Sequence, residues 1–426
     1  MTACPPFGFH YLSNPFPESS VIPVSTTAAM RRRRSSAVPV VLLLVALIFH
    51  AAGARLQAQG SRHSREEDSL LYVAASLIDE GDVDHARQIL VDGAKRFPSN
   101  SAFVYEQCYI LSAEKKHDEC RKLLMTIIDA PDAEGTYHQL LGNTLDYLGE
   151  PAAAIAAYER GLVRFPDSGP LYLERGIMSA MKNDHEEAMK YWEEGIARDP
   201  SFASNYFHAA RVWLQTKSPG WGLIYGEIFL NLEPKSERAD LMRGALFLSW
   251  NQAVSIRNGT PKEPLRKGET MGGGVDLFHE IAITIEDTTK QPMFPFEFYY
   301  SGTVMYSSAP YLAEGKEMMT IADLHAIRSR FLDKWFQDTS ISNHFAVDLF
   351  ERQKTLRAAG LFEAYDYALF RSNETEKEYG RWEEKNAAKY FELQHWLIDN
   401  RIAVEPGVAF SRLDLKGLPI PERADE

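Results

Sequence analysis

The stretch GPLYLERGIMSAMKNDHEEAMKYWEEGIARDP, from Gly169 to Pro200, decides the fold. Its apolar and small residues recur at intervals of three, four and seven, which is the period of an amphipathic α-helix. The polar run at 182–184 interrupts this period, so the stretch is predicted to form two antiparallel helices. Small residues such as Gly176 and Gly195 allow the two backbones to approach closely, and Pro200 ends the second helix because it cannot continue the hydrogen-bond ladder. A hairpin this short cannot bury its own apolar stripe and needs copies beside it.

The copies recur every 34 residues. Steps of 34 from Pro200 reach Pro234 in one direction and Pro166, Asp132 and Pro98 in the other. Each unit carries one small residue before its turn and another after it. The first set is Ala74, Cys108, Gly142, Gly176 and Ala210, and the second is Ala86, Cys120, Ala154, Ala188 and Gly222. A regular register over five units predicts a stacked array of helical hairpins over residues 66–234.

This spacing and residue pattern resembles the tetratricopeptide repeat (TPR) family, whose period is 34. The resemblance implies an all-α fold, a right-handed solenoid of helical hairpins whose concave face is lined by the first helix of each repeat. On that lining, the candidate partner-binding residues are Tyr105, Tyr109, Gln139, Asn143, Phe207 and Arg211. Two tyrosines, two amides, a phenylalanine and one arginine suit an extended peptide or a helix. Family members that grip a carboxylate tail use several basic residues, and only Arg211 is basic here.

Two cysteines occupy facing small positions of the second repeat. Cys108 and Cys120 could form a disulfide in an oxidising compartment, or they could fill the seam as buried thiols. The sequence does not distinguish between the disulfide and the two buried thiols. No further ligand type repeats near them, so no metal site is predicted.

The first 58 residues read as a leader. Four arginines at 31–34 precede an apolar run at 40–49, and small residues near Ala54 and Ala58 offer cleavage sites, a pattern typical of a secretory signal peptide. We expect Met30 to be the true start and the protein to be exported, either periplasmic or secreted. The alternative is an uncleaved leader that anchors the chain to a membrane.

The remainder is predicted to be helical but without the repeat. Residues 235–259 are expected to form a capping helix, 260–274 a linker, 275–405 a helical C-terminal region and 406–426 a tail. Asn373 and Glu376 are placed as a capping box before the last helix. The aromatic stretch at 294–300 is expected to be core rather than a ligand platform. The passages IRSRFLDKWF and GLFEAYDYALF resemble C-terminal regions of exported repeat proteins from Gram-negative bacteria.

The composition and motifs favour a binding protein. A net charge of −13 speaks against a nucleic-acid partner. We therefore expect a scaffold that binds a protein or peptide in the cell envelope, without catalytic residues, cofactor or metal. The alternative is an enzyme whose site lies in the C-terminal helices, with the repeats recruiting substrate. Its candidate residues are His279 with Glu280, Asp323 with His325, and His344 with Asp348, none of which has the spacing of a zinc-protease motif.

Overall fold

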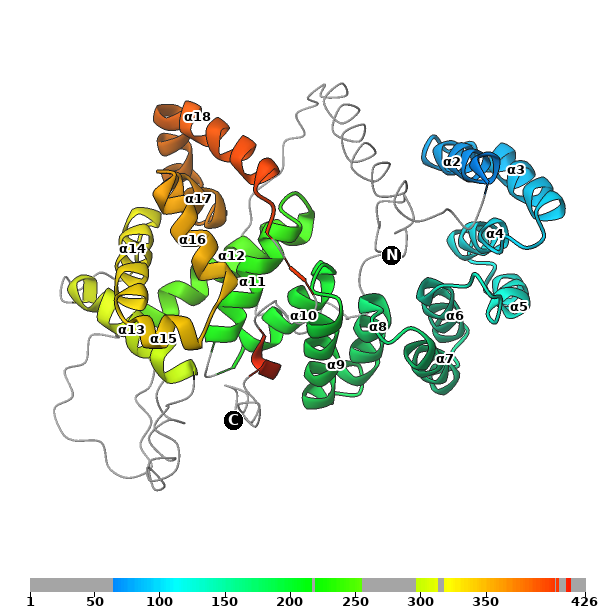
Figure 1. The fold of residues 1–426 in the computed structure, drawn as a ribbon, viewed down its shortest axis with the longest axis horizontal. Coiled ribbons are helices and arrows are strands. Elements are labelled where there is room, and N and C mark those ends of the chain that lie inside the picture. Colours follow the sequence, from blue (N-terminus) through cyan, green and yellow to red (C-terminus); the bar gives the residue numbers. More distant parts are fainter. Residues whose placement is uncertain are drawn as a thin grey trace, which may run out of the picture. The chain divides into compact units, whose positions relative to one another are not determined.

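The computed structural model describes residues 64–216, 219–254, 296–312, 318–402, 404–405 and 411–414. Every regular element in these ranges is a helix, which confirms the all-α prediction (Figure 1). The leader, the linker at 260–274 and most of the tail lie outside the described residues. Among the helices that are described, none combines the length and apolar character needed to cross a membrane.

Five helical hairpins follow one another along the chain. Each consists of two antiparallel helices joined by a turn of a few residues. They are α2 (Arg65–Asp79) with α3 (Val83–Arg96), α4 (Ala102–Ala113) with α5 (His117–Ile127), α6 (Gly135–Tyr147) with α7 (Pro151–Arg164), α8 (Gly169–Ala180) with α9 (His185–Arg198), and α10 (Ala203–Trp213) with α11 (Gly220–Leu232). The 34-residue pattern in the sequence therefore corresponds to hairpins in the structure.

The turns inside the hairpins repeat the same backbone conformation. A positive φ occurs at Gly81 (85°), Lys115 (60°), Gly149 (77°) and Asn183 (60°), and each of these residues lies 34 positions after the one before. The left-handed region is nearly free of cost for glycine and tolerable for asparagine, whereas lysine is strained there. The period of 34 residues therefore appears in the backbone conformation of these turns as well as in the positions of the apolar residues.

Close helix contact inside the fourth hairpin depends on a glycine. A Cβ atom added to Gly176 on α8 would lie 2.3 Å from Nε1 of Trp192 on α9. The indole instead uses that space and donates a hydrogen bond to the carbonyl of Leu173 at 3.2 Å. Gly176 therefore leaves the space that the Trp192 indole occupies.

The chain divides into two compact units, Met1–Ala157 and Tyr158–Glu426, and the division falls inside α7. Each unit is described here by itself. In the first, Ala74, Leu90, Phe103 and Ile110 form a core contributed by α2, α3 and α4.

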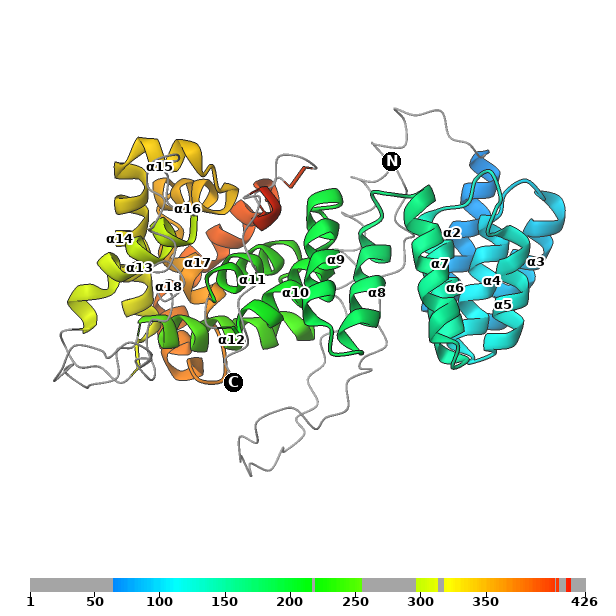
Figure 2. The same cartoon turned by 90° about the horizontal axis from the view of Figure 1, so that it is seen from below.

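In the second unit, the fourth and fifth hairpins share one hydrophobic core with the helices that follow them (Figure 2). These are α12 (Glu237–Val254), α13 (Phe296–Leu312), α14 (Ile321–Gln337), α15 (Thr339–His344), α16 (Asp348–Ala358), α17 (Phe362–Leu369) and α18 (Glu376–Asp399), with the short 3₁₀-helix η5 (Arg412–Asp414). Phe296 and Tyr300, from the aromatic stretch, are 1% and 3% exposed and belong to that core.

Two local predictions in this unit are wrong. The N-cap of α18 is Thr375, not Asn373, because the Thr375 hydroxyl is used to close the preceding turn by donating to the carbonyl of buried Phe370 at 2.7 Å. The apolar spacing of residues 235–259 also predicts Leu241 on the same buried face of α12 as Phe247 and Trp250, but Leu241 is 70% exposed while the other two are buried.

Candidate functional site

The four lining residues predicted in the first unit differ in their exposure. Tyr105 on α4 is partly exposed, and its ring stacks on Tyr137 of α6 with centroids 4.6 Å apart and planes within 8°. Gln139 on α6 is buried, whereas Tyr109 and Asn143 keep part of their surface. Burial raises the pKa of both the Tyr105 and Tyr109 hydroxyls, so they remain neutral donors and acceptors at neutral pH. Tyr109 and Asn143 thus retain surface that a partner could contact.

A buried carboxylate accompanies these tyrosines. Glu106 on α4 is 9% exposed, and its Oε2 has no hydrogen-bond partner among the described residues. Burial raises its pKa to about 7. The side chain is therefore close to half ionised at neutral pH.

The two lining residues predicted in the second unit are packed together. Phe207 on α10 is 7% exposed, and its centroid lies 5.0 Å from that of Phe229 on α11. The guanidinium groups of Arg211 and Arg238 lie 5.5 and 5.2 Å from the same ring. Both arginines make cation–π contacts with Phe207, and of the two only Arg211 is exposed.

The two cysteines are free, fully buried thiols in the structure. Cys120 Sγ lies 3.3 Å from the carbonyl oxygen of Cys108 and 3.4 Å from Oγ1 of Thr144. In the structure, Cys108 and Cys120 therefore fill the contact between the helices of the second hairpin as buried thiols.

The candidate catalytic pairs do not act as pairs where they are described. Asp323 caps α14, accepting hydrogen bonds from the backbone N–H and hydroxyl of Thr320 at 3.0 and 2.8 Å. His325 instead contacts Asp366 of α17, with Nδ1 2.8 Å from Oδ2. His279, Glu280 and the side chain of His344 lie outside the described residues. In the ranges that are described, no three His, Cys, Asp or Glu side chains are grouped so as to hold a metal.

The feature that the sequence did not indicate is a buried arginine site on α9, α10 and α11. Glu193 on α9 is 0% exposed, and Arg412 of η5 reaches it across 219 residues of sequence. Arg412 Nε lies 2.9 and 3.0 Å from the two carboxylate oxygens, and Nη2 lies 2.5 Å from Oε2. Both figures of the fold show η5, in red, next to α9 (Figures 1 and 2).

Two aromatic residues complete this site. The Trp213 indole of α10 donates to Glu193 Oε1 at 3.2 Å, and its ring lies 5.3 Å from the Arg412 guanidinium. The Arg412 backbone N–H donates to the hydroxyl of Tyr225 on α11 at 3.0 Å. We call Glu193, Trp213 and Tyr225 the Glu193 socket.

The socket keeps its arginine charged. Burial alone would lower the pKa of Arg412, but its hydrogen bonds to Glu193 and the charge of that carboxylate outweigh burial and raise the pKa. Glu297 on α13 adds negative charge nearby and accepts a hydrogen bond from Trp221 at 2.7 Å. Burial raises the pKa of Glu297, so its charge is less favoured than that of an exposed glutamate.

The socket lies on a different face of α10 from the predicted lining. Trp213 follows Arg211 by two residues, which is a rotation of about 200° around an α-helix. The described segment of tail therefore contacts the side of α10 that faces away from Arg211.

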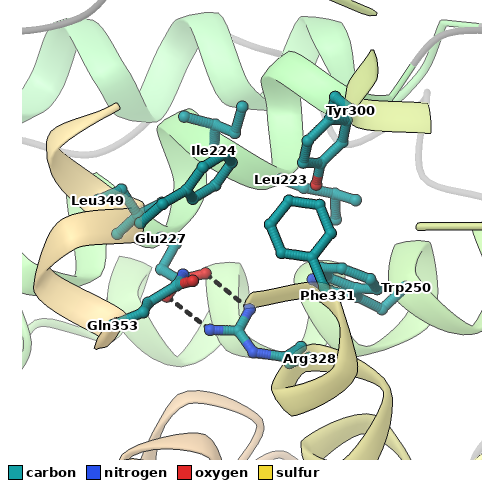
Figure 3. A pocket seen from close by; sticks show the side chains of 10 residues that line it. Leu223, Ile224, Glu227, Trp250, Tyr300, Arg328, Phe331, Leu349 and Gln353 are labelled. Atoms are coloured by element: carbon teal, nitrogen blue, oxygen red, sulfur yellow. Dashed lines mark hydrogen bonds and ion pairs between the residues drawn. The ribbon is translucent and has the colours of Figure 1, made fainter. Parts of the chain in front are cut away.

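A second buried polar cluster ties the fifth hairpin to the C-terminal helices. Arg328 of α14 donates to both oxygens of Glu227 on α11 at 2.8 and 2.7 Å (Figure 3). It also donates to Asp366 of α17 at 2.8 Å. Gln353 and Tyr365 also donate to Glu227, at 2.7 and 2.9 Å. Burial opposes the charge of Arg328, but the two carboxylates outweigh it and raise the pKa. The hollow beside this cluster has room for about one water molecule, so we interpret the cluster as structural.

The fold defines the class of protein: an all-α protein built from helical hairpins that repeat every 34 residues, with further helices sharing the core of the last two hairpins. No family model and no curated protein matches the chain. Among solved structures, it is similar to MamA from Desulfovibrio magneticus (11% identity, 41% of this chain and 98% of that one, TM-score 0.31).

Two other solved structures are also similar. YrrB, described as a TPR protein with an unusual peptide-binding site, shares 16% identity over 41% of this chain and 91% of its own, with a TM-score of 0.29. A tetratricopeptide repeat protein from Parabacteroides merdae shares 12% identity over 74% of this chain and 98% of its own, also with a TM-score of 0.29. At these identities and TM-scores, nothing about function follows from the matches.

Proposed function

We propose that this protein is a scaffold whose helical hairpins bind segments of other polypeptides. The observation that carries the proposal is the seating of Ser411–Asp414 on α9, α10 and α11. Ser411 and Arg412 are 1% and 7% exposed there, although they belong to a short segment far from the hairpins in sequence. A surface that buries a segment of this chain has the shape and charge to bury a segment of another.

The proposal assigns a partner surface to the first unit as well. Tyr109 and Asn143 offer a ring, a hydroxyl and an amide that can meet an extended backbone or a helix. Tyr105, which is also partly exposed, adds a second ring to this surface, and Arg211 with Phe207 plays a similar part in the second unit.

Site-specific photo-cross-linking tests this surface. The full chain would carry benzoylphenylalanine either at Tyr109 on α4 or, as a matched control, at Met125, which is 56% exposed on α5 of the same hairpin. After irradiation in an envelope extract, we expect discrete protein adducts from position 109 and none of the same mass from position 125. Identical adduct patterns from both positions, or none from a folded protein, would contradict the proposal.

We further propose that the scaffold works outside the cytoplasm, in the cell envelope. The support is the signal-like leader, with its arginines and apolar run. Expression of the full chain in a Gram-negative host, followed by fractionation and N-terminal sequencing, tests it. We expect a periplasmic form that begins after Ala54 or Ala58. An intact chain in the membrane fraction would favour the anchored alternative, and an intact cytoplasmic chain would refute export.

A further inference from the structure

We propose that the Glu193 socket recognises an arginine side chain presented by a short peptide segment of a partner protein, and that Ser411–Asp414, which forms the 3₁₀-helix η5 from Arg412 on, occupies it as an internal competitor. This inference rests on the proposed scaffold function and names the chemistry of one of its binding sites. It concerns α9, α10 and α11 of the second unit only.

The charge of Glu193 demands a cation. Its side chain is completely buried, and the neutral N–H of Trp213 cannot by itself replace the water that a carboxylate loses on burial. A buried carboxylate whose partner is removed is strongly unfavourable. When the tail leaves, the socket is therefore left with an affinity for any guanidinium that can enter.

The geometry selects arginine over lysine. The guanidinium meets both oxygens of Glu193 and lies over the Trp213 ring, which requires a flat group with several donors in a fork. A lysine ammonium is compact and cannot make the two-pronged contact. The Tyr225 hydroxyl also accepts a hydrogen bond from the backbone N–H of the arginine residue. The socket therefore recognises an arginine within a peptide rather than a free side chain.

The present occupant is a short helical segment bound through Arg412. Its helix η5 has three residues, and Arg412 supplies the salt bridge, the ring contact and the backbone hydrogen bond. The tail gains from being tethered, because a linked segment is present at an effective concentration in the millimolar range. A partner peptide can displace it when that peptide adds contacts of its own.

Fluorescence anisotropy with a labelled peptide tests the inference. The probe is the ten-residue peptide VAFSRLDLKG, taken from positions 408–417, and its matched controls carry lysine or alanine in place of the arginine. The proteins are the full chain, Arg412→Ala, and Arg412→Ala combined with Glu193→Gln. We expect Arg412→Ala to bind the arginine peptide about 100-fold more tightly than the unchanged chain does, because the tethered competitor is lost.

Two further results are expected from the same titrations. The lysine and alanine peptides should bind Arg412→Ala at least about tenfold more weakly than the arginine peptide, since they lack the two-pronged contact. Adding Glu193→Gln should abolish this preference. Equal binding of the three peptides, or no binding by folded Arg412→Ala, would overturn the proposal.

A second design covers the case in which Arg412→Ala does not fold. A protease site inserted after Glu405 allows the tail to be cut only after the full chain has folded. Excess arginine peptide should then release the cut tail, whereas the alanine peptide should not. Retention of the tail under both peptides would also overturn the proposal. If the socket fails these tests while cross-linking from Tyr109 persists, the scaffold function stands without it. If the peptide binds but cross-linking from Tyr109 is absent, the partner surface assigned to the first unit is wrong and the Glu193 socket stands.

Discussion

At the scale of single residues, Glu106 shows how burial sets pH dependence. Its pKa is raised to about 7 in the folded state from an ordinary value of 4.5, because burial disfavours the charged form. Below about pH 4.5 the carboxyl is neutral in both states, so the shift has no effect on stability. As pH rises from 4.5 to 7, the unfolded chain ionises more readily than the folded one, and stability falls. Above pH 7 the penalty is constant.

We therefore predict that Glu106→Gln stabilises the protein at high pH only. The free energy of unfolding should rise by up to about 3 kcal/mol at pH 8 and stay nearly unchanged at pH 4, since the amide carries no charge to bury. Urea unfolding followed by circular dichroism at the two pH values measures this. The exposed Glu119→Gln on α5 is the matched control and should change little at either pH. An equal effect of Glu106→Gln at both pH values would refute the argument.

At the scale of elements, the repeated turn is the informative feature. Gly81 and Gly149 adopt the left-handed conformation without strain, whereas Lys115 adopts it at the same place in its own hairpin. The strain energy of a lysine with positive φ exceeds the free energy that is lost when glycine makes the unfolded chain more flexible.

Lys115→Gly should accordingly stabilise the second hairpin. We expect the free energy of unfolding to rise by about 0.5–1 kcal/mol, and the reverse exchange, Gly149→Ala, to lower it by about 1 kcal/mol. Thermal unfolding followed by circular dichroism checks both variants. Destabilisation by Lys115→Gly would show that the lysine side chain contributes more than its backbone strain costs.

The elements were largely predictable because their signals are local. The period of 34, the prolines and the facing small residues such as Gly176 lie within one hairpin, and they indicated the hairpins found in the structure. The N-cap at Thr375 was missed because Asn373 offered the better sequence match, whereas in the structure the helix begins two residues later and the Thr375 hydroxyl closes the preceding turn on the carbonyl of Phe370.

The Glu193 socket was not predictable because its residues come together only when elements distant in sequence pack against one another. Glu193 is followed by Glu194 in an ordinary charged helix, and only packing against α10, α11 and the tail buries the first of them. Ser411–Asp414 carries no local motif that marks it as a ligand. A contact across 219 residues leaves no trace in a pattern with a period of 34.

At the scale of the whole molecule, Arg328 joins elements that are distant in sequence. It links α11, α14 and α17 of the second unit through two buried carboxylates, each under 5% exposed. Removing one partner of such a pair leaves a buried charge uncompensated. This lowers the stability more than replacing the whole pair by apolar residues does.

We predict that Arg328→Met lowers the free energy of unfolding by about 3–5 kcal/mol. Adding Glu227→Gln and Asp366→Asn should recover part of this loss, because the charges left behind are then removed. Denaturant unfolding followed by tryptophan fluorescence measures both variants. Arg357→Met, which breaks an exposed ion pair with Asp333, should have little effect. A loss no greater than that of Arg357→Met would mean that the cluster is dispensable.

The pairing of Glu193 with Arg412 also has a consequence for how the chain is made. Synthesis proceeds from the N-terminus, so the ribosome adds 219 further residues after Glu193 before the arginine exists. At about 5–20 residues per second, this takes roughly 10–45 s. During that interval the Glu193 carboxylate must stay in contact with water or pair with some other cation. The second unit can therefore reach its final packing only after Arg412 has been made, whereas the core residues of the first unit have all been made long before that point.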